Sequence, residues 1–194
     1  MAASNKLIVI GGSWGGIQAS INVLSELPAN YSIPVILVLH RLRNEEGSLP
    51  EIFDKKLKLK AVEVEEKEPL LPGHVYLAPA NYHVLLEKDH TFSLDDSELE
   101  NYSRPSIDVT FTSAADVFNE NTVGILLSGA SRDGSSGLKY IFENSGEAIV
   151  QNPSEAEVAT MPQAAIDSTP ACKIMRVAHI QQYLLTLHDL GRTY

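Results

Sequence analysis

The first forty residues contain the pattern that most restricts the fold, namely two short apolar runs separated by a glycine-rich turn and an amphipathic segment. Residues 7–10 and 34–39 are uniformly apolar, as expected of strands buried on both faces of a parallel sheet. Between them, apolar residues recur at helical spacing over 17–27, and Pro28 ends that segment. This order predicts a βαβ unit with a right-handed crossover.

The same alternation of helix and strand resumes after Ser106, which can cap a helix whose first turn contains Asp108. The predicted elements that follow are a strand over 122–127, a helix over 135–144, a strand over 147–151, a short helix over 161–167, a strand over 173–177 and a closing helix over 180–187. An alternation of strands and helices of this kind is typical of a doubly wound α/β domain with helices on both faces of a mostly parallel sheet.

Two segments between these halves differ from the rest. Residues 41–60 have the pattern of a loop and a helix with a basic, solvated end. Residues 61–101 contain short alternating pieces separated by breaks such as Pro72-Gly73, which predicts antiparallel hairpins inserted into the α/β pattern. We therefore predict one domain over residues 1–194 with a hairpin insertion at about 61–101.

Composition narrows the classes of function. The chain has 194 residues, 44% of them hydrophobic, and a formal net charge of −10. This charge argues against a nucleic-acid partner and against anionic membrane surfaces, and no apolar run has the roughly 20 residues that a membrane-spanning helix needs. One cysteine, Cys172, allows no internal disulfide and fits a cytoplasmic location, where we expect it to be structural. The histidines lack metal-site spacing, so no metal or cofactor is predicted.

Three polar residues with catalytic potential lie at the ends of predicted strands. Ser13 follows the first strand, His40 the second, and Asp133 lies in the loop after the strand over 122–127. Ligands of open α/β sheets bind outside these carboxyl ends. A serine, an imidazole and a carboxylate at one edge are the components of a nucleophilic triad. Each residue alone has a simpler explanation, because a strand-end histidine is commonly a packing or surface residue and an aspartate before a helix is commonly a cap.

The turn that contains Ser13 reads G-x-S-x-G from Gly11 to Gly15. A serine at a sharp strand-to-helix turn is raised to the sheet edge, and the N–H groups of the following helix point toward it. The Trp14 N–H is our candidate donor to an oxyanion, and Gly12 and Ala130 are further candidates for the oxyanion hole or the cleft. Alone, the motif is equally consistent with a phosphate-binding loop or a packing turn.

Six sequence segments, taken in their order along the chain, indicate a particular protein family. They are GGSWGG (11–16), LH (39–40), LPGHVYLAPANYH (71–83), RPSIDVTFTSAA (104–115), GILLSGASRDGSSG (124–137) and AIVQNPSEAEVATMPQAAI (148–166). In this order and spacing they resemble the catalytic domain of the chemotaxis protein-glutamate methylesterases, the CheB family. The resemblance extends from about Leu7 to Leu187.

This resemblance implies a specific activity. Members hydrolyse methyl esters of glutamate side chains on the cytoplasmic domains of chemoreceptors, release methanol, and in many cases deamidate receptor glutamines. The family's catalytic serine, histidine and aspartate fall on Ser13, His40 and Asp133. It also implies a monomer, with Arg104 and His83 as candidate contacts to substrate or cleft. Arg132, which departs from the family pattern, is a further candidate that could favour an acidic substrate or compete for Asp133. A salt bridge for Arg104 and surface packing for His83 are the alternatives.

The chain departs from the family pattern in three places. Trp14 replaces a small residue after the serine, which predicts a narrower cleft. Residues 129–132 stand where the family has G-M-G-x, so Ala130 and Ser131 replace the Met and the second Gly, and Arg132 adds a cation beside Asp133. An N-terminal receiver domain is expected in this family, whereas here the esterase pattern begins within the first ten residues. We therefore expect a stand-alone protein that either lacks control by phosphorylation within its own chain or is controlled by a separate receiver-type partner. A segment cut from a longer chain is the alternative.

Two other functions are considered beside a serine hydrolase. A binding or scaffold module could keep this fold with weak or no activity, for which Trp14 and residues 129–132 leave room. A nucleotide-binding domain rests only on the glycine turn, which lacks both the G-x-x-x-x-G-K-[ST] and the G-x-G-x-x-G spacing.

Overall fold

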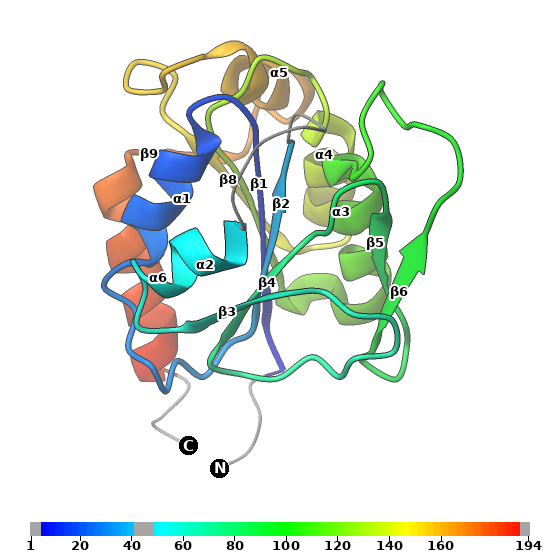
Figure 1. Cartoon of the computed structure of the whole chain (residues 1–194). Coiled ribbons are helices and arrows are strands. Elements are labelled where there is room, and N and C mark those ends of the chain that lie inside the picture. The colour runs from blue at the N-terminus through cyan, green and yellow to red at the C-terminus, as the bar shows by residue number, and fades with distance from the viewer. Residues whose placement is uncertain (1–4, 41–48, 191–194) are drawn as a thin grey trace.

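The computed structural model describes residues 5–40 and 49–190, and within them a seven-stranded parallel sheet forms the centre of the molecule (Figure 1). Its strands, given in chain order, are β1 (Leu7–Gly12), β2 (Val35–Leu39), β3 (Lys60–Glu63), β4 (His74–Leu77), β7 (Thr122–Leu126), β8 (Glu147–Gln151) and β9 (Lys173–Met175). The spatial order is β3-β4-β2-β1-β7-β8-β9. The strand order therefore reverses beside β1, and a ligand crevice is expected at such a point.

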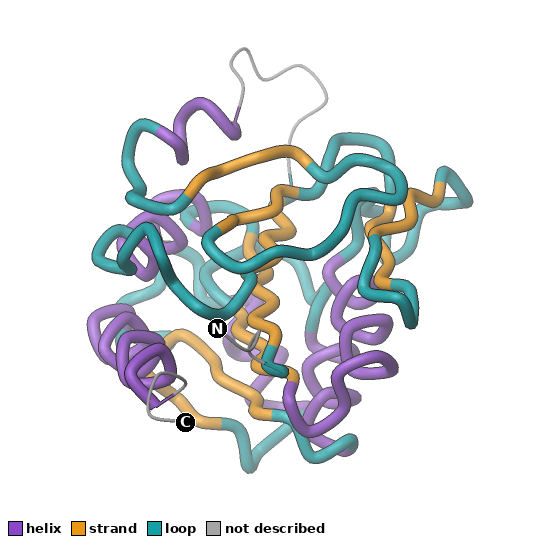
Figure 2. Tube along the Cα trace, turned by 90° about the horizontal axis from the view of Figure 1, so that it is seen from below, coloured by secondary structure: helices purple, strands orange, loops and turns teal. Residues whose placement is uncertain are grey.

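Helices cover both faces of the sheet (Figures 1 and 2). On one face, α1 (Gly16–Leu24), α2 (Leu49–Asp54) and α6 (Val177–Leu190) contribute to one hydrophobic cluster. On the other face, α3 (Ile107–Phe118), α4 (Ser135–Glu143) and α5 (Thr160–Ser168) contribute to a second. A short 3-10 helix, Asn119–Asn121, joins α3 to β7. The two faces bury alternate residues of β1, because successive side chains of a strand point to opposite sides.

The predicted doubly wound α/β fold is confirmed. β1 and β2 are buried along their whole length, as their apolar runs indicated. Ser106 is the N-cap of α3, and its hydroxyl accepts a hydrogen bond from the Val109 N–H at 3.4 Å. Sequence periodicity was sufficient to predict these elements because each of them is either uniformly apolar or strongly amphipathic.

The predicted hairpin insertion is wrong over its first half. β3 and β4 are parallel to each other and belong to the main sheet, in which β4 pairs with β2. Only β5 (His83–Leu86) and β6 (Phe92–Asp95) form an antiparallel pair. β3 is a four-residue edge strand in which Ala61 is buried, Val62 is half-buried and both ends are exposed. A pattern this short is compatible with parallel and with antiparallel pairing. The local sequence therefore did not reveal the direction of pairing.

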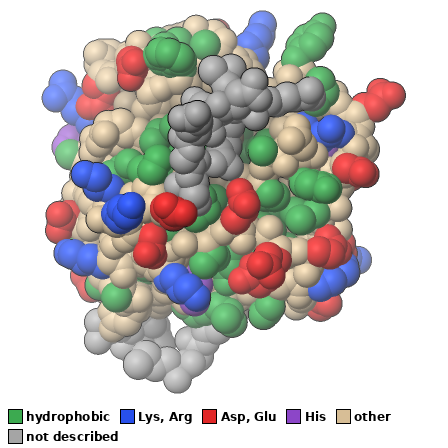
Figure 3. Space-filling model, viewed as in Figure 1, with side chains coloured by type: hydrophobic (Ala, Val, Ile, Leu, Met, Phe, Trp, Pro, Cys, Tyr) green, Lys and Arg blue, Asp and Glu red, His purple; other side chains and the backbone are tan. Residues whose placement is uncertain are grey.

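The segment predicted as a loop and a basic helix is described only in part, since residues 41–48 lie outside the described residues. The helix there is α2, which ends at Asp54, so the lysines at 55–60 follow the helix instead of forming its end. Among the described helices, none is long and apolar enough to cross a membrane. Acidic and basic side chains are interspersed on the face shown in Figure 3.

Phe111 offers a test of the core between α3 and the sheet. It is fully buried, and the neighbouring α4 approaches so closely that a Cβ on Gly137 would lie 2.7 Å from the Phe111 Cβ. We expect Phe111→Ala to lower the free energy of unfolding by about 3–5 kcal/mol. The substitution leaves a cavity in this tightly packed region, in addition to the loss of buried apolar surface. Phe142, which is 41% exposed, supplies the control. Urea unfolding should show a change of under about 0.5 kcal/mol for Phe142→Ala, and equal losses would contradict this packing.

Candidate active site

Ser13 occupies the turn between β1 and α1, directly after the end of β1. Its N–H donates to the Ser128 carbonyl at 2.9 Å, and its own carbonyl accepts from the Gly16 N–H at 2.8 Å. The main chain of Ser13 is thus held against the loop that follows β7. Its hydroxyl makes no hydrogen bond to another described residue and remains partly exposed. Such a hydroxyl is available to a substrate.

Two glycines allow the chain to crowd around Ser13. Gly15 has φ of 75°, and a Cβ there would lie 2.7 Å from both the Ser128 Oγ and the Glu157 Cβ. At Gly129 a Cβ would lie 2.9 Å from the Ser13 Cβ. Any larger residue at either position would push the Ser13 turn away from the loop after β7. Gly15, the last glycine of the G-x-S-x-G pattern, and Gly129 are therefore both required by the close packing around Ser13.

His40 follows β2 and lies beside the Ser13 turn, because its N–H donates to the Gly12 carbonyl at 3.1 Å. Its ring Nε2 lies 2.8 Å from the Asp133 Oδ2, and its side chain is 15% exposed. An ionised carboxylate only accepts, so Nε2 donates and Nδ1 keeps the free lone pair. In the usual triad Nδ1 faces the carboxylate and Nε2 faces the serine. Here the two ring nitrogens have exchanged these positions.

Asp133 is fully buried and accepts four hydrogen bonds. Its Oδ2 accepts from His40 and from the Ile107 N–H at 2.7 Å. Its Oδ1 accepts from the Ser106 hydroxyl at 2.9 Å and from the Asp108 N–H at 3.1 Å. Three of these donors belong to the N-terminal end of α3, where free N–H groups and the helix dipole favour an anion. Asp133 therefore joins α3 to His40.

These contacts determine the ionisation of Asp133. Burial alone raises the pKa of this carboxyl, but hydrogen bonds from His40 and from the Ile107 and Asp108 N–H groups outweigh burial and leave the pKa below its ordinary value. Asp133 is consequently an anion at neutral pH. It can orient His40 and stabilise the imidazolium that forms when His40 takes a proton.

Asp108 is a second buried carboxyl in the same turn of α3. Its Oδ1 accepts from the Gly137 N–H at 2.6 Å, and its Oδ2 accepts from the Asn101 amide at 3.0 Å. Burial raises the pKa of Asp108 to about 6, despite the Gly137 hydrogen bond, and the nearby Asp133 charge raises it further. Two carboxyl groups this close are costly to ionise together. Asp133 retains the charge because it has more donors.

The titration of Asp108 predicts a change of stability with pH. The folded protein binds this proton more tightly than the unfolded chain, so its free energy of unfolding falls as the pH rises from 3.8 toward about 6. Asp108→Asn lacks this titration. We expect urea unfolding to show the wild type losing on the order of 3 kcal/mol relative to Asp108→Asn between pH ~4 and pH ~7. A difference that stays constant with pH would contradict the assignment, and the exposed Asp116→Asn is the matched control.

The Trp14 side chain reaches the loop between β8 and α5. The indole is 65% exposed, and its Nε1–H donates to the Glu157 carboxylate at 2.8 Å. Glu157 belongs to the loop between β8 and α5. The indole is therefore drawn toward that loop by a polar contact that the local sequence did not reveal.

The oxyanion and cleft candidates differ in their surroundings. The N–H groups of Trp14 and Ala130 make no hydrogen bond to another described residue, and Ala130 is exposed. Gly12 is buried at the end of β1, where a Cβ would lie 3.2 Å from the Gly16 Cα and the Leu39 Cδ2. Trp14 and Ala130 thus have N–H groups available for a developing oxyanion, whereas Gly12 permits close packing.

The three candidate substrate contacts lie in different environments. His83 is buried, and its Nδ1 accepts from the Ser106 N–H at 3.1 Å while Nε2 faces the Glu98 carbonyl at 3.0 Å. It is therefore not a surface residue, and it supports the cap that binds Asp133. The Arg104 guanidinium donates to the backbone carbonyls of the 96–105 loop instead of forming the salt bridge considered above. Arg132 is exposed beside Asp133.

Sequence reasoning missed two roles in this site. Ser106 was recognised only as a helix cap, whereas its hydroxyl also binds Asp133. Ser128 was not singled out, although its carbonyl accepts from Ser13 and its hydroxyl donates to the Trp14 carbonyl at 2.8 Å. The one sequence signal for this role of Ser128 was its position directly after the apolar run of β7, the strand that pairs with β1. Its partners are distant in sequence and could not be read from the motif.

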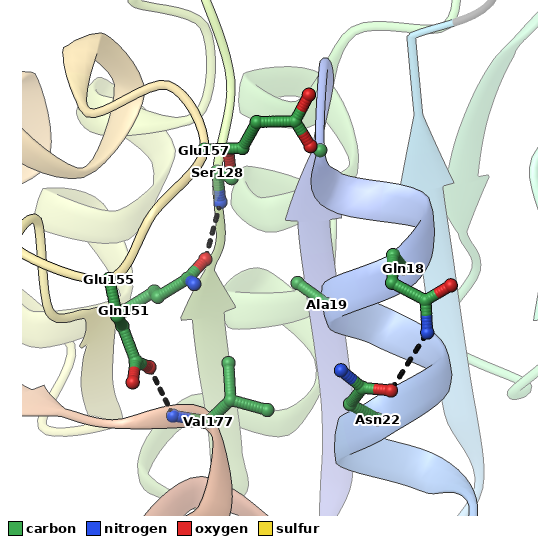
Figure 4. Close-up of a pocket in the computed structure, with 9 residues that line it drawn as sticks. Gln18, Ala19, Asn22, Ser128, Gln151, Glu155, Glu157 and Val177 are labelled. Carbon is green, nitrogen blue, oxygen red and sulfur yellow. Dashed lines mark hydrogen bonds between the residues drawn. The ribbon is translucent and has the colours of Figure 1, made fainter.

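A cavity of about 260 Å³ lies on the α1 side of the Ser13 turn (Figure 4). It is lined by Gly15, Gln18, Ala19, Asn22, Ser128, Gln151, Glu155, Glu157 and Val177. The Ser128 N–H, which donates to Gln151 Oε1 at 2.8 Å, connects this cavity to the turn. None of the three predicted triad residues lines it. The cavity is therefore a neighbour of the candidate site and not its reaction centre.

The fold and the site together define a class of protein. It is a doubly wound α/β protein whose strand ends hold an imidazole bound to a buried carboxylate, next to a serine on a strand-to-helix turn. This arrangement can transfer a proton to and from a hydroxyl at the sheet edge.

Comparisons with known proteins identify the family. The CheB methylesterase family model matches residues 8–184. A Leptospira interrogans protein, whose name includes protein-glutamate methylesterase/protein-glutamine glutaminase, is 44% identical over 182 residues, covering 94% of each chain. The Salmonella typhimurium protein-glutamate methylesterase/protein-glutamine glutaminase is 32% identical, and the match covers 99% of this chain and 56% of that protein. The crystal structure of the Thermotoga maritima CheB methylesterase catalytic domain superposes with a TM-score of 0.89 at 30% identity, covering 95% of this chain and 99% of that one. The chain belongs to the CheB methylesterase family.

Proposed function

We propose that this protein is a serine hydrolase that removes methyl groups from esterified glutamate side chains on the cytoplasmic domains of chemoreceptors. Ser13 is the nucleophile, His40 the general base and Asp133 the residue that orients His40. The observation that carries the proposal is the 2.8 Å hydrogen bond between His40 and the buried Asp133, beside the turn of Ser13. The names of the relatives support the substrate class.

The reaction proceeds in two halves. The Ser13 hydroxyl attacks the ester carbonyl while His40 Nδ1 takes its proton, and an oxyanion forms within reach of free backbone N–H groups. The C–O bond to the methoxy group then breaks, and His40 returns the proton so that methanol leaves. Water next attacks the acyl-enzyme with His40 again as base, which releases the glutamate side chain and restores Ser13. The same steps convert a glutamine amide to glutamate with release of ammonia.

Further properties follow from the family resemblance as parts of the proposal. The enzyme acts in the cytoplasm as a monomer, without metal or organic cofactor. Arg132 favours an acidic substrate because its exposed cation adjoins Asp133.

A scaffold module is the second candidate. The observation that favours it is the Ser13 hydroxyl, which makes no hydrogen bond to a described residue and so is not paired with His40. Catalytic hydrogen bonds are often long before substrate binds, so this geometry does not oppose catalysis.

Methanol release decides between these functions. Methylated receptor cytoplasmic domains are incubated with the intact protein, methanol is measured, and loss of the methyl group is followed by mass spectrometry. We expect catalytic release of methanol. Stable binding of the receptor domains without methanol release would overturn the esterase proposal in favour of the scaffold.

A further inference from the structure

The loop that connects β6 to α3, residues 96–105, is continuous with the candidate active site. It leads directly into Ser106 and Ile107, which both donate to Asp133. In Figure 1 this loop rises beside β5 and β6 to the edge at which β1 and β2 end. A protein substrate that brings a side chain to Ser13 therefore approaches the molecule on the side where this loop projects.

Several contacts hold the 96–105 loop in place. At its base, the Arg104 guanidinium donates to the Asp96 and Ser97 carbonyls. Near its tip, the Glu100 N–H donates to the Ser103 carbonyl and the Ser103 N–H to the Glu100 carbonyl, at 3.2 and 2.9 Å. The loop is therefore organised before any partner binds, which reduces the entropy lost on association.

Tyr102 occupies the tip of this loop and is 98% exposed. Its φ is 62° and that of Asn101 is 50°, so two consecutive residues other than glycine are left-handed. For Asn101 this is common, and its amide is bound to Asp108 at 3.0 Å. For a bulky residue such as Tyr102 the conformation costs on the order of 1–3 kcal/mol.

The Tyr102 ring does not stabilise the fold, because it is almost completely exposed. A strained, solvent-exposed aromatic residue on an anchored loop beside a reaction centre is better explained by binding. Tyrosine is enriched in interface cores, where its ring buries a large area at small entropic cost. In the same loop, Asp96, Glu98 and Glu100 are exposed and give the loop a negative charge.

We propose that the 96–105 loop is a docking surface for the polypeptide that carries the esterified glutamate, with the Tyr102 ring packed on an apolar side chain that lies near basic ones. This inference rests on the proposed function and deepens it. The loop contributes affinity for the protein substrate, whereas Ser13, His40 and Asp133 perform the reaction. The acidic side chains of the loop favour substrate polypeptides that carry basic residues near this apolar side chain, through charge complementarity.

Two variants of Tyr102 distinguish the contribution of the aromatic ring from that of the backbone conformation. Tyr102→Asn removes the ring but keeps a residue that tolerates positive φ, whereas Tyr102→Phe keeps the ring. Methanol release is measured from a methylated receptor domain and from a small glutamate γ-methyl ester. For Tyr102→Asn we expect KM for the receptor domain to rise about tenfold with kcat unchanged. Hydrolysis of the small ester stays at the wild-type rate, and Tyr102→Phe resembles the wild type on both substrates.

The control is Phe142→Ala, an exposed aromatic residue near the C-terminal end of α4, which should leave both substrates unaffected. An unchanged KM in Tyr102→Asn, with methanol release by the intact protein, overturns the docking surface and leaves the esterase proposal standing. An equal loss on both substrates also overturns it, because the loop would then act on the reaction centre. Failure of the intact protein to hydrolyse either ester overturns both proposals. Raising the salt concentration should increase KM for the receptor domain only.

Discussion

Ser13→Ala is expected to reduce methanol release by about 10,000-fold while leaving the fold intact. The substitution removes only the Oγ, which makes no hydrogen bond to a described residue, whereas the bonds that position Ser13 are made by its backbone N–H and carbonyl. Stability should therefore change by less than about 0.5 kcal/mol. Methanol release and urea unfolding, measured on the same preparation, check both halves of this prediction.

The matched control for this serine is Ser136→Ala. Ser136 is exposed in the first turn of α4 and is also near the sheet edge, so its replacement should change neither activity nor stability. Methanol release that survives in Ser13→Ala would exclude Ser13 as the nucleophile, and water activated by His40 would then be the alternative.

Asp133→Asn is expected to lower kcat by about 10,000-fold and also to destabilise the protein. Each Asp133 oxygen accepts from two donors, so an amide NH2 at either position faces donors instead of offering an acceptor. At least one backbone N–H or the His40 ring is then left without its partner. A buried donor without a partner costs about 1–3 kcal/mol, and loss of the anion at the start of α3 adds to this.

The stability effect of Asp133→Asn has a defined pH dependence. The folded-state pKa of Asp133 is below the ordinary 3.8, so its charge stabilises the protein above that pH and ceases to do so as the pH falls through the folded value. The difference in free energy of unfolding should therefore be largest near neutral pH and narrow in acid. Asp116→Asn, on the exposed side of α3, is the control. An Asp133→Asn enzyme with normal kcat would contradict the orienting role of Asp133.

The three predicted triad residues illustrate how far a sequence leads toward a site. Their placement at strand ends followed from apolar runs that stop at Ser13 and His40, and from a loop after β7 that contains Asp133. The pairing of His40 with Asp133 spans 93 residues. Strand order decides it, because β2 and β7 flank β1 on opposite sides.

The remaining differences arise where a contact between distant segments outweighs local pattern. His83 is buried because Ser106 and Glu98 satisfy both of its ring nitrogens. The Trp14 indole lies against the loop between β8 and α5 because Glu157 accepts its N–H. A burial estimate from residue type could anticipate neither, since both depend on which polar groups the fold brings near.

The sequence by itself determined the α/β class, most of the helices and strands, and the residue types at the ends of β1 and β2. It could do so because uniform apolarity and helical periodicity are local properties. Only the tertiary structure decided that β3 and β4 join the parallel sheet, that His40 presents Nε2 to Asp133, and that α3 supplies three donors to this carboxylate. These features depend on strand order and on hydrogen bonds between distant segments, which no local pattern encodes.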